Sequence, residues 1–266
     1  MNDAGANATS ISMPPATTSP TLIVLPGWAL GPQPLRPLIE ALRQQLPDWH
    51  IECASYAGLT SHRPESWVAM LDRTLPTGAW LAGWSLGGML ATALAQWRGH
   101  AACGLVTLGT NASFVARPGW PTAMSGETFE AFRDGLATGP GRTLTRFAQL
   151  SAQGGRDARR LSRTLLEALQ STPLDHSLAG LAVLATLDLR EALSTLRIPQ
   201  FHLFAENDLL VPVAARAAIA SRLPVGSRTA CLPDAGHAFP LAHAEETAER
   251  MAAFLRVSKR PRALAP

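Results

Sequence analysis

Short, mostly apolar runs alternate with segments of helical periodicity over much of the chain. The runs at 21–25 and 104–108 are continuous and apolar, as expected of buried strands, and six runs in all have the length and composition of β-strands. They span residues 21–25, 50–54, 79–84, 104–108, 200–205 and 228–232. Apolar residues recur at helical spacing in the segments 34–46, 65–75, 86–97, 188–196, 213–222 and 242–257. This alternation predicts an α/β fold with a mostly parallel sheet flanked by helices.

The rhythm changes between residues 111 and 187, where no strand-like run occurs. Four helical patterns follow one another there, at 126–136, 142–152, 157–170 and 177–187. We interpret this stretch as an all-helical cap, inserted over the open end of a core formed by residues 21–110 and 188–257. Residues 1–20 are rich in Ala, Thr, Ser and Pro and predict a mobile leader, whereas residues 258–266 predict a solvated basic tail.

The composition is that of a compact soluble protein, since 47% of its 266 residues are hydrophobic and 16% are charged. No apolar stretch approaches the roughly 18 residues of a membrane span, and the N-terminus has no secretory signal pattern. Cys53, Cys103 and Cys231 lie far apart in apolar contexts, which indicates buried free thiols. A reducing cytoplasm suits such thiols, so we expect a cytoplasmic protein. We also expect a monomer without nucleic-acid or membrane partners.

The third strand-like run leads into a Gly-x-Ser-x-Gly pattern, and a helical pattern follows at once. This is the setting of a nucleophile elbow, in which a strand turns sharply into a helix. Gly83 and Gly87 permit the turn because they lack Cβ atoms, and Ser85 is lifted above the sheet. The N–H of Leu86 is then placed to donate to an oxyanion. The alternative interpretation of Ser85 is an ordinary helix N-cap.

A serine nucleophile needs a base, and the base needs an orienting carboxylate. His237 follows the last strand-like run, and Asp208 follows the run before it. The order Ser85, Asp208, His237 is that of the α/β-hydrolases. Glu206 and Asp234 are alternative orienting groups, since each lies a few residues from one of these positions.

The second oxyanion donor is expected on the loop that leaves the first strand. There Pro26-Gly27-Trp28 offers the N–H of Trp28. The Trp28 ring has the alternative interpretation of a simple core residue. Serine chemistry of this kind requires no metal and no organic cofactor, so we predict neither.

Together with the elbow and the histidine loop, several short motifs along the chain are shared with one enzyme family. They are GW at 27–28, GWSLGG at 83–88, WP at 120–121, RTLTRF at 142–147, DAR at 157–159, LDLR at 187–190 and AGHA at 235–238. On these segments the chain resembles, over residues 21–257, the pimeloyl-acyl-carrier-protein methyl ester esterases of biotin synthesis. The resemblance implies a single α/β-hydrolase domain that carries a helical cap.

The resemblance also implies a serine carboxylesterase that hydrolyses the methyl ester of a pimeloyl chain on acyl-carrier protein and releases methanol. In that scheme Ser85 attacks the carbonyl, His237 is the base, and Trp28 and Leu86 hold the oxyanion. The same fold also supports a general short-chain carboxylesterase, an acyltransferase or a C–C hydrolase. A ligand-binding relative that turns over slowly is the alternative of another class.

The resemblance also directs attention to two groups of residues, a substrate-binding wall and a basic face on the cap. A substrate-binding wall comprises Phe147, Ala148, Gln149, Leu150 and Ser151, in addition to Trp28, Ser85, Leu86 and His237. A basic face for docking the acidic carrier protein comprises Arg142, Arg146, Arg156 and Arg159. The alternative interpretations are a cap-core aromatic for Phe147 and a solvated charged face for the arginines.

The chain departs from the family pattern in three places. Pro26 stands where the family usually has His, which predicts a stiffer oxyanion loop. Ser151 stands where the family often has Gln, and Gln149 lies two residues earlier. The two strand-like runs that usually open the fold are missing, which predicts a sheet that begins one hairpin short.

Overall fold

The computed structural model describes residues 19–155 and 157–258. Its centre is a sheet of six parallel strands in the order β2-β1-β3-β4-β5-β6. The strands are β1 (Thr21–Leu25), β2 (His50–Cys53), β3 (Trp80–Trp84), β4 (Gly104–Leu108), β5 (Gln200–Ala205) and β6 (Arg228–Leu232). The predicted α/β fold is confirmed.

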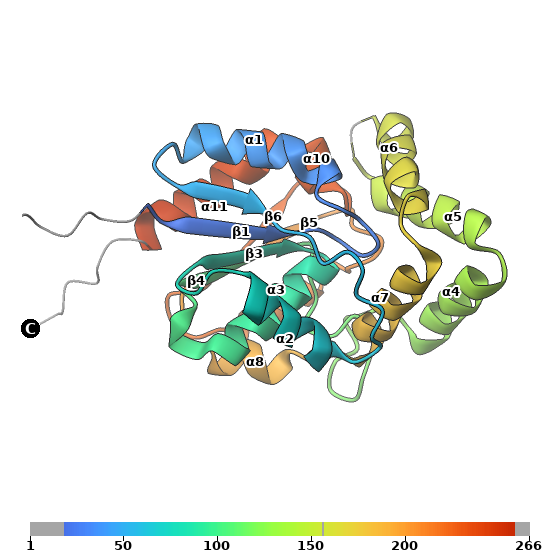
Figure 1. The fold of residues 1–266 in the computed structure, drawn as a ribbon, viewed down its shortest axis with the longest axis horizontal. Coiled ribbons are helices and arrows are strands. Elements are labelled where there is room, and N and C mark those ends of the chain that lie inside the picture. The colour runs from blue at the N-terminus through green and yellow to red at the C-terminus, as the bar shows by residue number, and fades with distance from the viewer. Residues whose placement is uncertain (1–18, 156, 259–266) are drawn as a thin grey trace, which may run out of the picture.

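Helices cover both faces of this sheet (Figure 1). One face carries α1 (Arg36–Gln45), α10 (Phe239–Ala242) and α11 (Ala244–Ser258), and the other carries α2 (Pro64–Thr74), α3 (Leu86–Arg98) and α8 (Arg190–Thr195). The remaining short elements of the core are α9 (Ala215–Ala220) and the 3₁₀ turns η1 (Gln33–Leu35) and η2 (Gly99–Ala101). This double cover explains why β1, β3, β4 and β5 are almost wholly apolar, because neither face of the sheet meets water.

Several predicted helices differ from the structure at their ends. The pattern at 34–46 is a 3₁₀ turn followed by α1. The pattern at 242–257 is wrong at its start, because His243 leaves the helical conformation and separates α10 from α11. Periodicity could not find α10, because four residues are too few for a helical pattern.

The predicted cap helices are α4 (Gly126–Thr138), α5 (Pro140–Ala152), α6 (Ala158–Gln170) and α7 (Leu174–Thr186). They stand together beyond the carboxyl ends of the strands (Figure 1). α7 begins three residues before its predicted start, because Pro173 serves as its N-cap. Isolated bridges such as the one between Val115 and Met124 shape the segment between β4 and α4.

Other sequence expectations have mixed outcomes. The three cysteines are unpaired as predicted, but Cys103 is exposed and the other two are only half-buried, so the expectation of buried thiols is wrong. None of the helices in the described ranges is both long and apolar enough to cross a membrane. The residues placed by the structure also contain no cluster of three or more His, Cys, Asp or Glu suited to a metal ion.

Candidate active site

Ser85 occupies the sharp turn between β3 and α3. Its backbone has φ 55° and ψ −120°, a strained conformation for a residue other than glycine. A Cβ on Gly83 would lie 2.2 Å from the Gly87 carbonyl carbon, and a Cβ on Gly87 would lie 2.2 Å from the Pro26 oxygen. Both glycines are therefore required, since the first turn of α3 presses against β3 and against the end of β1.

The hydroxyl of Ser85 is not used to cap the helix. Ser85 is the N-cap residue of α3 by position, but its side chain makes no capping hydrogen bond. The backbone N–H of Ser85 donates to the Leu108 carbonyl at 2.9 Å, which fixes the turn to β4. The side chain faces a cavity, where its Oγ is available for chemistry.

His237 and Asp208 meet at the same edge of the sheet. Nδ1 of His237 lies 2.7 Å from Oδ2 of Asp208, and both side chains are 1% exposed. The other carboxylate oxygen, Oδ1, accepts the backbone N–H groups of Leu210 and Val211, each at 2.8 Å. Since the carboxylate occupies Nδ1, Nε2 is the ring nitrogen that remains for proton transfer.

The alternative orienting groups lie elsewhere. Oε2 of Glu206 accepts the backbone N–H of Asp234 at 3.2 Å, and both residues are exposed. Asp234 has φ 49° and shapes the turn before the histidine loop. Among the other histidines, His202 lies inside the sheet 2.7 Å from the Thr107 hydroxyl, and burial lowers its pKa to about 3. The structure thus places Asp208 against His237.

The oxyanion loop, residues 26–28, is held from the core and from the cap. The buried hydroxyl of Tyr56 donates to the carbonyls of Pro26 at 2.9 Å and Gly27 at 2.5 Å. Burial raises the pKa of Tyr56 well above its usual value, so the hydroxyl keeps the proton that it donates. From the cap side, Nε1 of Trp28 donates to the Ser177 carbonyl on α7 at 2.8 Å.

The two expected oxyanion donors lie on adjoining segments. The close approach of Gly87 to the Pro26 carbonyl brings the start of α3, where Leu86 lies, against the oxyanion loop. The side chains of Trp28 and Leu86 both reach Gly180 of α7, at 2.8 Å and 3.6 Å from the position of its missing Cβ. The backbone N–H groups of Trp28 and Leu86 therefore remain our proposed donors. Tyr56 was missed by the sequence reasoning, because its contact with this loop spans 29 and 30 residues.

Replacing Tyr56 with phenylalanine is expected to lower kcat about threefold to tenfold with little change in KM, because the oxyanion loop loses its anchor. Stability should fall by about 1 kcal/mol, the usual effect of losing one buried hydrogen bond. The matched control is Thr107→Val, which removes a buried hydroxyl from the middle of the sheet. Steady-state kinetics and thermal unfolding of both variants check this; equal kcat values in the two variants would contradict the role of Tyr56.

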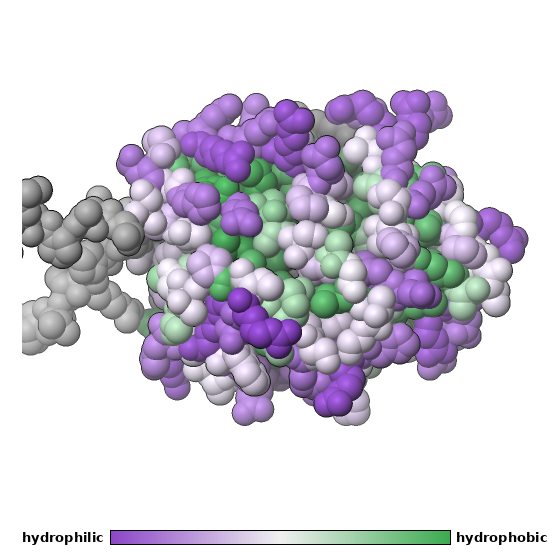
Figure 2. Space-filling view, in the orientation of Figure 1, coloured by the Kyte–Doolittle hydropathy of each residue, from purple (hydrophilic) through white to green (hydrophobic). Residues whose placement is uncertain are grey.

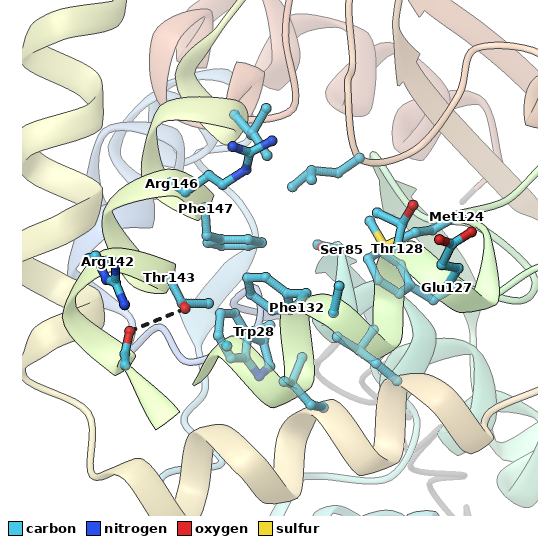
Figure 3. Close-up of a pocket in the computed structure, with 18 of the residues that line it drawn as sticks. Trp28, Ser85, Met124, Glu127, Thr128, Phe132, Arg142, Thr143, Arg146 and Phe147 are labelled. Carbon is cyan, nitrogen blue, oxygen red and sulfur yellow. Dashed lines mark hydrogen bonds between the residues drawn. The ribbon is translucent and has the colours of Figure 1, made fainter. Parts of the chain in front are cut away.

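A cavity of about 730 Å³ opens between the core and the cap, with Ser85 in its wall (Figure 3). Three aromatic rings form one side: Trp28 lies 4.9 Å from Phe147 and 5.5 Å from Phe132, centroid to centroid. The remaining apolar side chains of the lining are Phe114, Met124, Ala131, Leu150, Leu181, Leu184 and Leu210. The cavity is thus suited to an extended aliphatic chain.

The predicted wall at 147–151 is corrected by the structure. Phe147 and Leu150 line the cavity, but Ala148 and Ser151 are buried away from it and Gln149 is exposed. The reason is helical geometry, because successive residues of α5 point about 100° apart and five in a row cannot share one wall. Ala148, Gln149 and Ser151 therefore do not line this cavity, and Phe147 and Leu150 remain the predicted contacts of α5 with substrate.

Sequence reasoning also missed the wall formed by α4. Thr128, Ala131, Phe132 and Gly135 of α4 line the cavity at spacings of three, one and three residues. The same helical spacing relates Arg142, Thr143, Arg146, Phe147 and Leu150 of α5. A search of the predicted cap helices for one continuous face of this kind could have found both walls.

Two of the predicted docking arginines lie at the cavity. Arg142 and Arg146 are exposed, one turn apart on α5, and both line the cavity (Figure 3). Arg159 is exposed on α6. Arg156 lies outside the described residues.

Comparison with known proteins adds three findings. Residues 22–250 match the alpha/beta hydrolase family. The pimeloyl-[acyl-carrier protein] methyl ester esterase of Aromatoleum aromaticum is 38% identical over 86% of this chain and 95% of its own length. The biotin biosynthesis bifunctional protein BioHC of Saccharophagus degradans is 30% identical over 88% of this chain, which corresponds to 44% of that protein. An esterase from Exiguobacterium antarcticum shares the fold, with a TM-score of 0.78 at 16% identity over 90% of this chain and 92% of that chain.

Proposed function

Since the chain belongs to the α/β-hydrolase family and, within it, to the pimeloyl-[acyl-carrier protein] methyl ester esterases, we propose that it hydrolyses the methyl ester of a pimeloyl chain on acyl-carrier protein. The enzyme is a carboxylic ester hydrolase of biotin synthesis. One observation carries the proposal: Ser85 lies in the wall of an apolar cavity whose mouth bears Arg142 and Arg146. Such a cavity suits an aliphatic ester that arrives on an acidic carrier.

The proposed acylation step uses Ser85, His237 and two backbone donors. Nε2 of His237 takes the proton from Oγ of Ser85 as Oγ attacks the ester carbonyl carbon. The N–H groups of Trp28 and Leu86 stabilise the oxyanion of the tetrahedral intermediate. His237 then gives its proton to the leaving methoxide, and methanol departs. The pimeloyl chain is left as an ester on Ser85.

Deacylation repeats the same steps with water. His237 removes a proton from the attacking water, and the second tetrahedral intermediate collapses to release the carboxylate of the pimeloyl chain. Asp208 keeps the imidazole in one orientation and stabilises the imidazolium in both half-reactions. Its 2.7 Å contact with Nδ1 supports this role.

We propose different contacts for the pimeloyl chain of the substrate and for its carrier protein. We assign the methylene groups to the rings of Trp28, Phe132 and Phe147, which pack on one another along the cavity. We assign the carrier protein to the arginines on α5 and α6, the predicted docking face. Hydrophilic side chains gather along the outer side of α6 (Figure 2), and Arg159 and Arg163 are exposed on that helix. These exposed cations support an electrostatic docking surface.

Reversing the charge of Arg142 and Arg146 together, by Arg142→Glu and Arg146→Glu, is expected to lower kcat/KM for the carrier-bound ester about 100-fold. The loss on a free p-nitrophenyl ester should be much smaller, because that substrate needs no docking. The control pair is Arg73→Glu with Arg216→Glu, two exposed arginines on α2 and α9. Equal losses on both substrates would point to a damaged pocket and contradict docking at this face.

The test of the proposed function compares kcat/KM for pimeloyl-carrier methyl ester with that for the free p-nitrophenyl ester. A strong preference for the carrier-bound ester is the expected result. Fast hydrolysis of the free ester alone would indicate a general short-chain esterase, and transfer of the acyl group to an alcohol would indicate an acyltransferase. If the folded protein releases no p-nitrophenol, the result would favour the alternative of a ligand-binding relative without esterase activity. We further propose that the protein is a monomer and that it resides in the cytoplasm, where unpaired cysteines are typical.

A further inference from the structure

Trp84 lies at the point where three catalytic segments meet. It is the last residue of β3, directly before Ser85, and is 2% exposed. Its indole Nε1 donates to the His237 carbonyl at 3.0 Å, and the two rings lie 5.6 Å apart at 39°. On another side, a Cβ on Gly27 would lie 3.2 Å from Cε3 of Trp84. The indole thus packs between the histidine loop and the oxyanion loop.

Asp208 contacts the ring of His237, and two other neighbours hold its backbone. Its carbonyl is held by Trp84, and the next N–H, that of Ala238, donates to the Ser151 carbonyl of α5 at 2.9 Å. A Cβ on Gly236 would lie only 1.9 Å from the Gln153 carbonyl oxygen, so the cap packs tightly against this loop. Trp84 supplies the hold from the core, and α5 supplies it from the cap.

We propose that Trp84 is a positioning residue for this reaction, an inference that rests on the proposed function. Its N–H fixes the His237 peptide, and its ring sets the spacing between the histidine loop and the oxyanion loop. The base lies on a loop, and loops shift more readily than strands. An anchor at the end of β3, directly before the proposed nucleophile, keeps Nε2 of His237 in a constant place relative to Oγ of Ser85. A misplacement of about 1 Å can cost about 100-fold in rate.

The first test is Trp84→Phe, which removes the N–H and keeps an aromatic side chain. We expect kcat for a free p-nitrophenyl ester to fall about 10-fold to 100-fold, with KM changed less than about twofold. The matched control is Trp120→Phe, which also removes a buried indole donor, here bonded to Oδ1 of Asn111 at 2.9 Å. Trp120 belongs to a separate buried cluster, so this variant should lose comparable thermal stability while its kcat stays within about twofold of the parent.

A second variant separates the hydrogen bond from the packing and remains informative if Trp84→Phe does not fold. Replacing Trp84 with β-(3-benzothienyl)alanine keeps the bicyclic ring and exchanges the N–H for sulfur. The proposal expects the same loss of kcat at unchanged KM in this isosteric variant. A kcat within about twofold of the parent, or an equal loss in Trp120→Phe, overturns it. If the parent itself has no Ser85-dependent activity, the proposed function fails instead, so the two failures are distinguishable.

Discussion

Replacing Ser85 with alanine is expected to abolish ester hydrolysis, with kcat lowered by about 10⁴-fold or more. In the proposed mechanism Oγ of Ser85 forms the acyl-enzyme, and alanine offers no substitute. The fold should persist, because this hydroxyl makes no capping hydrogen bond and the turn depends on Gly83 and Gly87. Alanine must adopt the same positive φ as serine, so the backbone strain is unchanged.

Two measurements check the Ser85 variant. The first is p-nitrophenol release, with thermal unfolding as the test of folding. The second is the intact mass after treatment with a fluorophosphonate, which should add one adduct to the parent and none to Ser85→Ala. Ser221→Ala, at an exposed serine following α9, is the control and should behave as the parent. Turnover by Ser85→Ala at the parental rate would remove Ser85 from the mechanism.

Replacing Asp208 with asparagine is expected to lower kcat by about 10³-fold to 10⁴-fold, because it imposes the wrong histidine tautomer. The backbone N–H groups of Leu210 and Val211 donate to Oδ1, so the amide oxygen of asparagine must take that position. The amide NH₂ then faces Nδ1 of His237, which accepts a hydrogen bond from it. The ring proton moves to Nε2, and the imidazole can no longer remove the serine proton.

The alternatives left open by the sequence provide the controls for this variant. Glu206→Gln and Asp234→Asn preserve shape and remove one negative charge each, at exposed positions that contact each other. Both are expected to keep kcat within about twofold of the parent. The measurement is the pH profile of kcat/KM for the three variants. An inactive Glu206→Gln beside an active Asp208→Asn would identify Glu206 as the orienting carboxylate.

The sequence by itself determined the sheet, the elbow and the short set of catalytic candidates. Burial on two faces makes the central strands β1, β3 and β4 nearly continuous apolar runs, a local property, and the bounds of the strands agree with the predicted runs to within one residue. The elbow is also local, because Gly83 and Gly87 must lack Cβ atoms for Ser85 to occupy the turn. Since parallel strands share one carboxyl edge, the positions of Asp208 and His237 after strands already predicted that they lie near Ser85.

Only the tertiary structure decided which candidates meet and what holds them. The choice of Asp208 over Glu206 depends on a contact across 29 residues, and the bond from Trp84 to His237 spans 153. The segment 147–151 gave the wrong cavity wall, because a helix turns successive side chains to different sides. Composition and periodicity report neighbours along the chain. Hydrogen bonds and packing between distant segments depend on how the cap and the loops pack against the sheet in the folded protein.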